Sequence, residues 1–228
     1  MENKLREYAK LLIEIGLNVQ QGQTLVISSP VDCAPFARLC ASAAYDVGCR
    51  EVVMRWTDDY MNRERFLRAD DSVFDSLPLG QKEFLNGYAA EGAAYLSISA
   101  RDPEALRGVD PDRITRANRT DEDISAFYDA MMANVNPWCV ASVPIPSWAK
   151  KVFPEMRTSQ AMEKLWEAIL STSRVDEDPL AAWDAHNQDL HDRCQYLNSL
   201  HLRQLKYKSA NGTDLTAVSY THLRAHET

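Results

Sequence analysis

The chain has 228 residues, of which 45% are hydrophobic and 25% are charged, and its formal net charge at pH 7 is −8. This negative charge, with no basic run, argues against nucleic acid or anionic lipid as a partner. No apolar run approaches the length of about 18 residues that would predict a membrane span. The first residues are charged and amphipathic, unlike a signal peptide, so the cytoplasm is the expected location.

Cysteine usage fits this compartment. The cysteines are odd in number, lie far apart and form no C-x-x-C motif, which favours reduced and mostly buried thiols over disulfides or a zinc site. They are Cys33, Cys40, Cys49, Cys139 and Cys194.

The first part of the chain predicts a βαβ unit. An amphipathic helix over 2–15 is expected to end with Gly16 as its C′ residue. The apolar, β-branched run TLVISS (24–29) predicts a buried strand, and EVVMRW (51–56) predicts a second one. The small-residue stretch between them, ending at Gly48, predicts the helix that connects parallel strands.

The alternation then continues along the chain. Two or three helices are expected within 59–90, and proline after Asp102 and after Asp110 predicts two further helix starts. Further strands are expected at 93–99 and 137–143, and an amphipathic helix at 158–171. The sequence therefore predicts an α/β fold, with a Rossmann-like, mostly parallel sheet flanked by helices on both faces.

After residue 172 the pattern changes. A long helix is predicted at about 179–200, followed by an exposed antiparallel hairpin at 203–216 whose Asn211-Gly212 pair supplies positive φ angles. An isolated hairpin is marginal in stability. We therefore expect an α/β domain at 1–172 and, at 173–216, a connecting helix with the truncated start of a second domain, whose uncovered strands favour self-association.

Acidic residues follow the second predicted strand. Asp58 and Asp59 lie at its carboxyl end, where α/β proteins form ligand sites, although an N-cap with a solvated neighbour is the favoured interpretation. The turn after the first strand, SSPVDCAP, lacks the glycines of G-x-G-x-x-G and of G-x-x-x-x-G-K, which argues against nucleotide binding.

Histidines in the second half do not form a recognisable site. His186 and His191 lie five residues apart, so they do not share a helix face as i, i+4 ligands would. A polar helix face is favoured over a metal site for this region, which also holds His201, Asp184, Asp189 and Asp192. The tryptophans are expected to anchor packing, namely Trp138, Trp148, Trp166 and Trp183. No catalytic, cofactor-binding or metal-ligating residue is assigned within the chain.

An ordered series of segments carries a family resemblance. GLNVQQGQTLVISSPVDCAPFARLCASAAYDVGCREVVMRWTDD, DPEALRGVDPDRI, IPSWAKKVFP, AMEKLWEAI, RVDEDPLAAWDAHNQDLHDRCQYLNSL and LKYKSANGTDLT together resemble the aminopeptidase T / aminopeptidase S / PepS family of metallo-aminopeptidases. The resemblance implies an α/β N-terminal domain, a C-terminal domain with two divalent metal ions (zinc, cobalt or manganese), peptide substrates and a homodimer. It places the metal ligands beyond the GTDL segment, so this N-terminal part is expected to bind no metal and to be inactive.

The last residues resemble something else. VSYTHLRAHET (218–228) is similar to one reading frame of a transposase sequencing adapter. Segment 217–228 is therefore expected not to be native, Thr216 is the last residue assigned to the protein, and His222 and His226 are left out of functional reasoning. Deleting this segment is expected to leave thermal stability unchanged.

Three functions stay open from the sequence. The first is the N-terminal part of a cytoplasmic metallo-aminopeptidase. The second is a Rossmann-like module that holds a small ligand near Ser28, Ser29 and Asp58. The third is an interaction role without catalysis. Sequence beyond Thr216 would discriminate among them.

Overall fold

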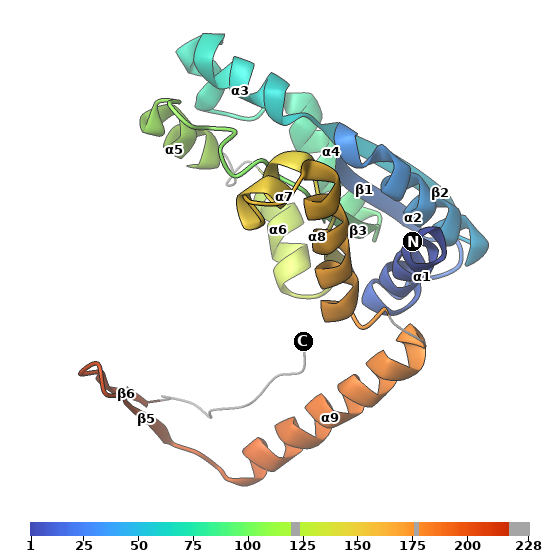
Figure 1. Cartoon of the computed structure of the whole chain (residues 1–228), viewed down its shortest axis with the longest axis vertical. Coiled ribbons are helices and arrows are strands. Elements are labelled where there is room, and N and C mark those ends of the chain that lie inside the picture. The colour runs from blue at the N-terminus through green and yellow to red at the C-terminus, as the bar shows by residue number, and fades with distance from the viewer. Residues whose placement is uncertain (120–123, 176–177, 219–228) are drawn as a thin grey trace. The chain divides into compact units, whose positions relative to one another are not determined.

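The computed structural model describes residues 1–119, 124–175 and 178–218 (Figure 1). The chain divides into two compact units, Met1–Pro179 and Leu180–Thr228, whereas the sequence predicts a boundary between 172 and 173. Within the described ranges, no helix combines the length and apolar character needed to cross a membrane.

The first unit contains a four-stranded sheet with the order β2-β1-β3-β4, and every neighbouring pair is parallel. The predicted mostly parallel α/β sheet is therefore confirmed. Each strand coincides with a short apolar run of the sequence. The strands are β1 (Thr24–Pro30), β2 (Glu51–Thr57), β3 (Ala94–Ser99) and β4 (Trp138–Ser142).

Helices connect the strands, as parallel pairing requires. The α-helices of this unit are α1 (Glu2–Leu11), α2 (Ala34–Asp46), α3 (Asp59–Arg68), α4 (Leu79–Ala90), α5 (Pro111–Arg119), α6 (Ser125–Met132), α7 (Pro146–Val152) and α8 (Thr158–Thr172). Two 3-10 turns, η2 (Val31–Cys33) and η3 (Asp71–Phe74), and one π-helical turn, η1 (Leu12–Gly16), complete the described helical elements.

Both faces of the sheet are covered at its amino-terminal half. On one face, Val26 and Tyr95 are buried in a cluster with Leu85 of α4 and Phe127 of α6. On the opposite face, Leu25, Ile27, Leu96 and Ile98 are buried. Helices α1, α2 and α8 pack there through aromatic side chains. The ring centroid of Phe36 lies 5.2 Å from that of Tyr8 and 5.9 Å from that of Trp166.

Gly16 does not end the first helix in the predicted way. It has no positive φ and instead belongs to the π turn η1, which continues α1. A Cβ at this position would lie 3.1 Å from the Cys139 Sγ of β4. The glycine therefore permits a close approach of helix and sheet rather than a left-handed cap.

The prediction that a helix begins after Asp102 is wrong. Residues 103–108 form successive turns, with backbone bonds from Ala105 to Asp102 and from Arg107 to Glu104. The Asp102 carboxylate accepts the Glu104 N–H at 2.9 Å, which favours a turn as readily as a helix cap. The helix predicted after Asp110 is confirmed as α5, and Asp110 accepts the Asp112 N–H at 2.9 Å.

A second, smaller core lies beyond the carboxyl ends of the strands. It is formed by α3, η3 and residues 101–118, which we call the α3–α5 lobe. The lobe lies at one end of the unit in Figure 1. Phe66, Phe74 and Val109 are buried at its centre, and the two phenyl rings stack with centroids 5.2 Å apart. The guanidinium of Arg113 lies over the Phe74 ring at 5.3 Å from its centroid.

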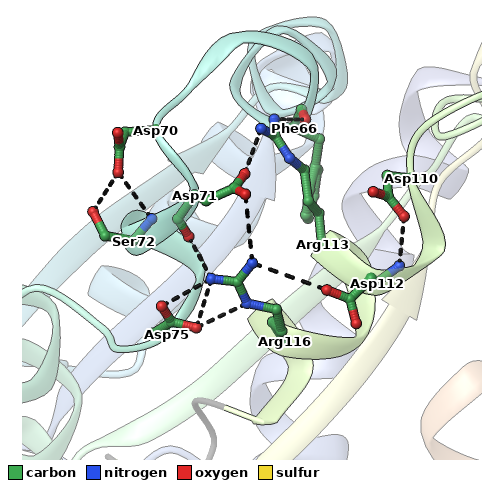
Figure 2. A network of polar contacts seen from close by, with 9 residues as sticks. All are labelled: Phe66, Asp70, Asp71, Ser72, Asp75, Asp110, Asp112, Arg113 and Arg116. Carbon is green, nitrogen blue, oxygen red and sulfur yellow. Dashed lines mark hydrogen bonds and ion pairs between the residues drawn. The ribbon is translucent and has the colours of Figure 1, made fainter.

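Polar contacts close the outer side of the lobe (Figure 2). Arg116 of α5 donates to both carboxylate oxygens of Asp75 at 2.8 Å and to the Asp71 carbonyl at 2.9 Å. Arg113 donates to the Phe66 carbonyl at 2.7 Å and pairs with the Asp71 carboxylate. Residues far apart in sequence are thus held together, which fixes residues 101–118 against α3 and η3.

The second unit contains most of α9 (Pro179–Ser199) and the hairpin of β5 (Gln204–Lys208) and β6 (Asp214–Val218). The two strands pair antiparallel, as predicted. Of the two turn residues, only Gly212 has a positive φ, at 92°. Asn211 instead accepts the Thr213 N–H and hydroxyl through its side-chain oxygen, which stabilises the turn without a left-handed backbone.

The hairpin is exposed. Tyr207, Leu215 and Val218 each expose more than half of their surface. Ala217 and Val218, the first residues of the predicted adapter segment, belong to β6 and pair with Leu205 and Gln204 of β5. Residues 219–228, including His222 and His226, lie outside the described residues.

Candidate functional site

A cleft of about 650 Å³ opens where the parallel strands end. It lies between the carboxyl ends of β1, β2 and β3 and the α3–α5 lobe. The chain passes from β1 to β2 in one direction and from β2 past β1 to β3 in the other, so strand order reverses here. Open α/β sheets bind ligands at such a switch point.

The floor of the cleft is a row of polar side chains. Ser28 of β1 pairs with Arg55 of β2 on one side and with Ser97 of β3 on the other, so all three side chains project from the same face. The row before it, which contains Val26 and Tyr95, is covered by α4 and α6. The face is therefore covered for its amino-terminal half and open two residues further on.

The first turn of α3 forms one wall. Asp58 caps the helix by accepting the Met61 N–H at 3.0 Å, which confirms the N-cap part of the favoured interpretation. Asp59 is not merely a solvated neighbour: its carboxylate accepts the Asp102 N–H at 2.9 Å and ties the helix to the opposite wall. Both residues also line the cleft.

Arg63 of α3 also binds the turn segment 103–108. The Arg63 guanidinium donates to the carbonyls of Ala105 and Arg107 at 2.8 and 2.7 Å. These bonds satisfy carbonyls of the turn segment 103–108, which has no helix to satisfy them. The wall made by that segment is thus positioned by α3.

Of the described residues that line the cleft, three are arginines, and they differ in whether the guanidinium has a partner within the protein. Arg65 donates to the Val73 carbonyl at 3.0 Å and lies over the Phe74 ring. Arg55 and Arg101 are exposed, and their guanidiniums have no hydrogen bond or ion pair to the described residues. Their donors are therefore available to a ligand.

Sequence reasoning found part of this site. Ser28 and Asp58 line the cleft, as the small-ligand hypothesis expected. Ser29 does not, because it is buried on the opposite face and its hydroxyl donates to the Pro30 carbonyl. Arg55, Ser97 and Arg101 were missed; alternation along β2 and β3 could have placed the first two on one face, but only strand register brings them together.

His186 and His191, both on α9, do not converge on a common site. His186 lies edge-on against the Trp183 ring at 5.5 Å, and the His191 Nε2 lies 2.6 Å from the Gln195 Nε2, one turn along α9. Asp189 pairs with Arg193, and Asp192 accepts from Gln188, also along the helix. Among the described residues, no three histidine, cysteine, aspartate or glutamate side chains are placed to hold a metal ion.

The cysteines match the sequence prediction of free, mostly buried thiols: Cys33, Cys40 and Cys49 are buried, and the other two are partly buried. Burial, with a smaller contribution from Asp32, raises the pKa of the Cys33 thiol to about 11. Burial also raises the pKa values of Cys40 and Cys139. A thiol that stays protonated at neutral pH is a poor nucleophile.

The tryptophans pack only partly as expected. Trp166 packs on Phe36, which fits an anchoring role. Trp138 is 40% exposed, although its indole N–H donates to the Met131 carbonyl at 3.1 Å. Trp148 and Trp183 are half-buried.

Known proteins are similar to this chain over most of its length. The family described as thermophilic metalloprotease (M29) matches residues 1–224, a range that includes most of the segment 217–228. "Aminopeptidase 2" of Geobacillus stearothermophilus is 40% identical over 210 residues, which cover 91% of this chain and 51% of that protein. "Aminopeptidase T" of Thermus thermophilus is 35% identical over 216 residues, covering 94% of this chain and 53% of that protein.

A solved structure agrees with these relatives. Wild-type AmpT from Thermus thermophilus superimposes with a TM-score of 0.86 at 32% sequence identity, covering 95% of this chain and 53% of that one. The chain thus spans about half the length of the curated relatives it matches. On the extent of the family match and the shared fold, the chain belongs to the thermophilic metalloprotease (M29) family.

Proposed function

We propose that this chain is the amino-terminal half of a metal-dependent aminopeptidase that releases N-terminal amino acids from peptides. The observation that carries the proposal is the match to proteins named aminopeptidase over 91–94% of this chain but only about half of theirs. The peptide substrates, a cytoplasmic location and a homodimeric assembly belong to the same proposal.

The proposal places the metal site beyond Thr216. The family description implies metal ions, and we propose two divalent ions, of zinc, cobalt or manganese. Bound ions of this kind activate a water molecule and polarise the scissile carbonyl. The described residues do not fit such a group, because His186, His191 and their acidic neighbours face partners along α9 or solvent rather than one another.

This chain's own part in the reaction is therefore structural. Unit Met1–Pro179 has its own core and its own sheet, so it supplies a preformed surface on which a catalytic half can assemble. Its residues are not proposed to hold or transfer a proton during peptide hydrolysis.

The test begins with the gene. The reading frame that follows the Thr216 codon should continue and encode glutamate, histidine and aspartate ligands, and the extended protein should hydrolyse an aminoacyl p-nitroanilide when zinc, cobalt or manganese is added. Residues 1–228 alone should show no hydrolysis under the same conditions. A stop codon directly after Thr216, or metal-dependent hydrolysis by residues 1–228, would contradict the proposal.

A further inference from the structure

We propose that the cleft at the carboxyl ends of β1, β2 and β3 is a binding site for a small oxyanion, a phosphate or carboxylate group held by Arg55 and Arg101. This site lies wholly within the α/β unit. The proposal rests on the cleft's own residues and does not depend on the aminopeptidase activity.

The first argument for an anion site is that hydrogen-bond donors in the cleft have no partner among the described residues. The guanidiniums of Arg55 and Arg101 line the cleft without an ion pair or hydrogen bond to the described part of the chain. The hydroxyls of Ser28 and Ser97 lie in the same row as Arg55 and likewise have no side-chain partner there. Two guanidinium groups and two hydroxyls in one cleft can supply the hydrogen-bond donors that an oxyanion requires.

The carboxylates of the cleft are already engaged. Asp58 accepts from Met61 N, Asp59 from Asp102 N, and Asp102 from Glu104 N. Backbone N–H groups thus offset part of their negative charge and hold them in the walls. Each carboxylate is held in a wall by one such bond, whereas the guanidiniums of Arg55 and Arg101 have no partner among the described residues, and this difference favours an anion.

The charge balance limits the affinity. Among the described residues, three arginines and three aspartates line the cleft, so their formal charges cancel and long-range attraction of an anion is weak. Binding must therefore come from short-range contacts in an open cleft. Two such contacts correspond to a dissociation constant on the order of 1 mM for a single phosphate or carboxylate group.

The local backbone favours a compact group over a dinucleotide. After β1 the chain turns through Pro30 into the 3-10 turn η2, with no glycine that would allow close approach to a pyrophosphate. A second depression, beside Arg50 at the opposite ends of the strands, is a poorer candidate. There the guanidinium already donates to Thr24 and Glu91.

The experiment titrates the 228-residue chain with inorganic phosphate in one arm and with acetate or succinate in another, at constant ionic strength maintained with chloride. Binding is followed by calorimetry and by the shift of the melting temperature. The variants are Arg55→Ala, Arg101→Ala and, as a conservative form, Arg55→Lys. The matched control is Arg107→Ala, which removes one positive charge from the same segment but not from the cleft lining.

We expect the unmodified chain to bind at least one probe, and the arm that binds identifies phosphate or carboxylate as the preferred group. Each cleft alanine variant should weaken that binding by about tenfold or more, Arg55→Lys should weaken it less, and Arg107→Ala should leave it unchanged. No binding of any probe, or an equal loss in Arg107→Ala, overturns the proposal. Because Arg55 and Arg101 come from different elements, a folding defect in one variant leaves the other as the test.

Discussion

Replacing Phe74 with alanine should selectively destabilise the α3–α5 lobe. The Phe74 side chain is fully buried, stacks on Phe66 with an interplanar angle of 4°, and lies beneath the guanidiniums of Arg65 and Arg113. Truncating a buried phenylalanine costs about 3–5 kcal/mol through lost transfer free energy and the cavity left behind. The lobe has a small core of three buried residues, so little else can offset this loss.

Urea unfolding and native-state hydrogen exchange measure the effect. We expect the free energy of unfolding to fall by about 3–5 kcal/mol for Phe74→Ala, and by about 1–2 kcal/mol for Phe74→Leu, which keeps most of the volume but loses the ring contacts. Exchange should quicken first in α3 and α5. The control is Tyr60→Ala on α3, whose side chain is 70% exposed and should change stability by no more than about 0.5 kcal/mol. A loss for Phe74→Ala no larger than that of Tyr60→Ala would refute the reasoning that this core holds the lobe.

Two further predictions concern the thiols and the cleft wall. Since burial raises the pKa of Cys33 from 9.0 to about 11, stability from the neutral thiol is complete below about pH 9 and is lost as the pH rises towards 11. Urea unfolding should therefore show a shallower alkaline decline in Cys33→Ala, by up to about 1.4 kcal/mol per pH unit, and an unchanged slope would contradict the assignment. Arg63→Met keeps the aliphatic stem but removes two hydrogen bonds to the turn segment, so it should cost about 1–2 kcal/mol. The same change at the exposed Arg68 should cost much less, and equal losses would show that the Arg63 bonds add nothing.

Local sequence predicted the elements of the sheet well. The runs around Leu25, Val52 and Leu96 are short and apolar and are separated by helical stretches, which is the pattern of a parallel sheet buried on both faces. These signals depend on neighbouring residues, so they survive without tertiary information. The family resemblance rested on six segments along the chain, of which the first contains the runs around Leu25 and Val52, and it is confirmed by the family match.

Local sequence failed where two interpretations compete for one motif. Asp102-Pro103 and Asp110-Pro111 read alike, yet only the second begins a helix. The difference lies in distant partners: Asp59 binds the Asp102 N–H and Arg63 binds the carbonyls that follow. Gly16 likewise reads as a helix stop, whereas its role is set by Cys139 on a strand far along the chain.

The candidate site shows the same division. The sequence alone determined the strand-helix alternation, the buried thiols and the acidic pair Asp58–Asp59 after a strand, because each is encoded by residues close together. Only the tertiary structure decided that Arg55, Ser28 and Ser97 form one row and that Arg101 lines the same cleft. The physical reason is that strand register and the packing of the lobe are set by contacts between residues dozens of positions apart, which no local pattern contains.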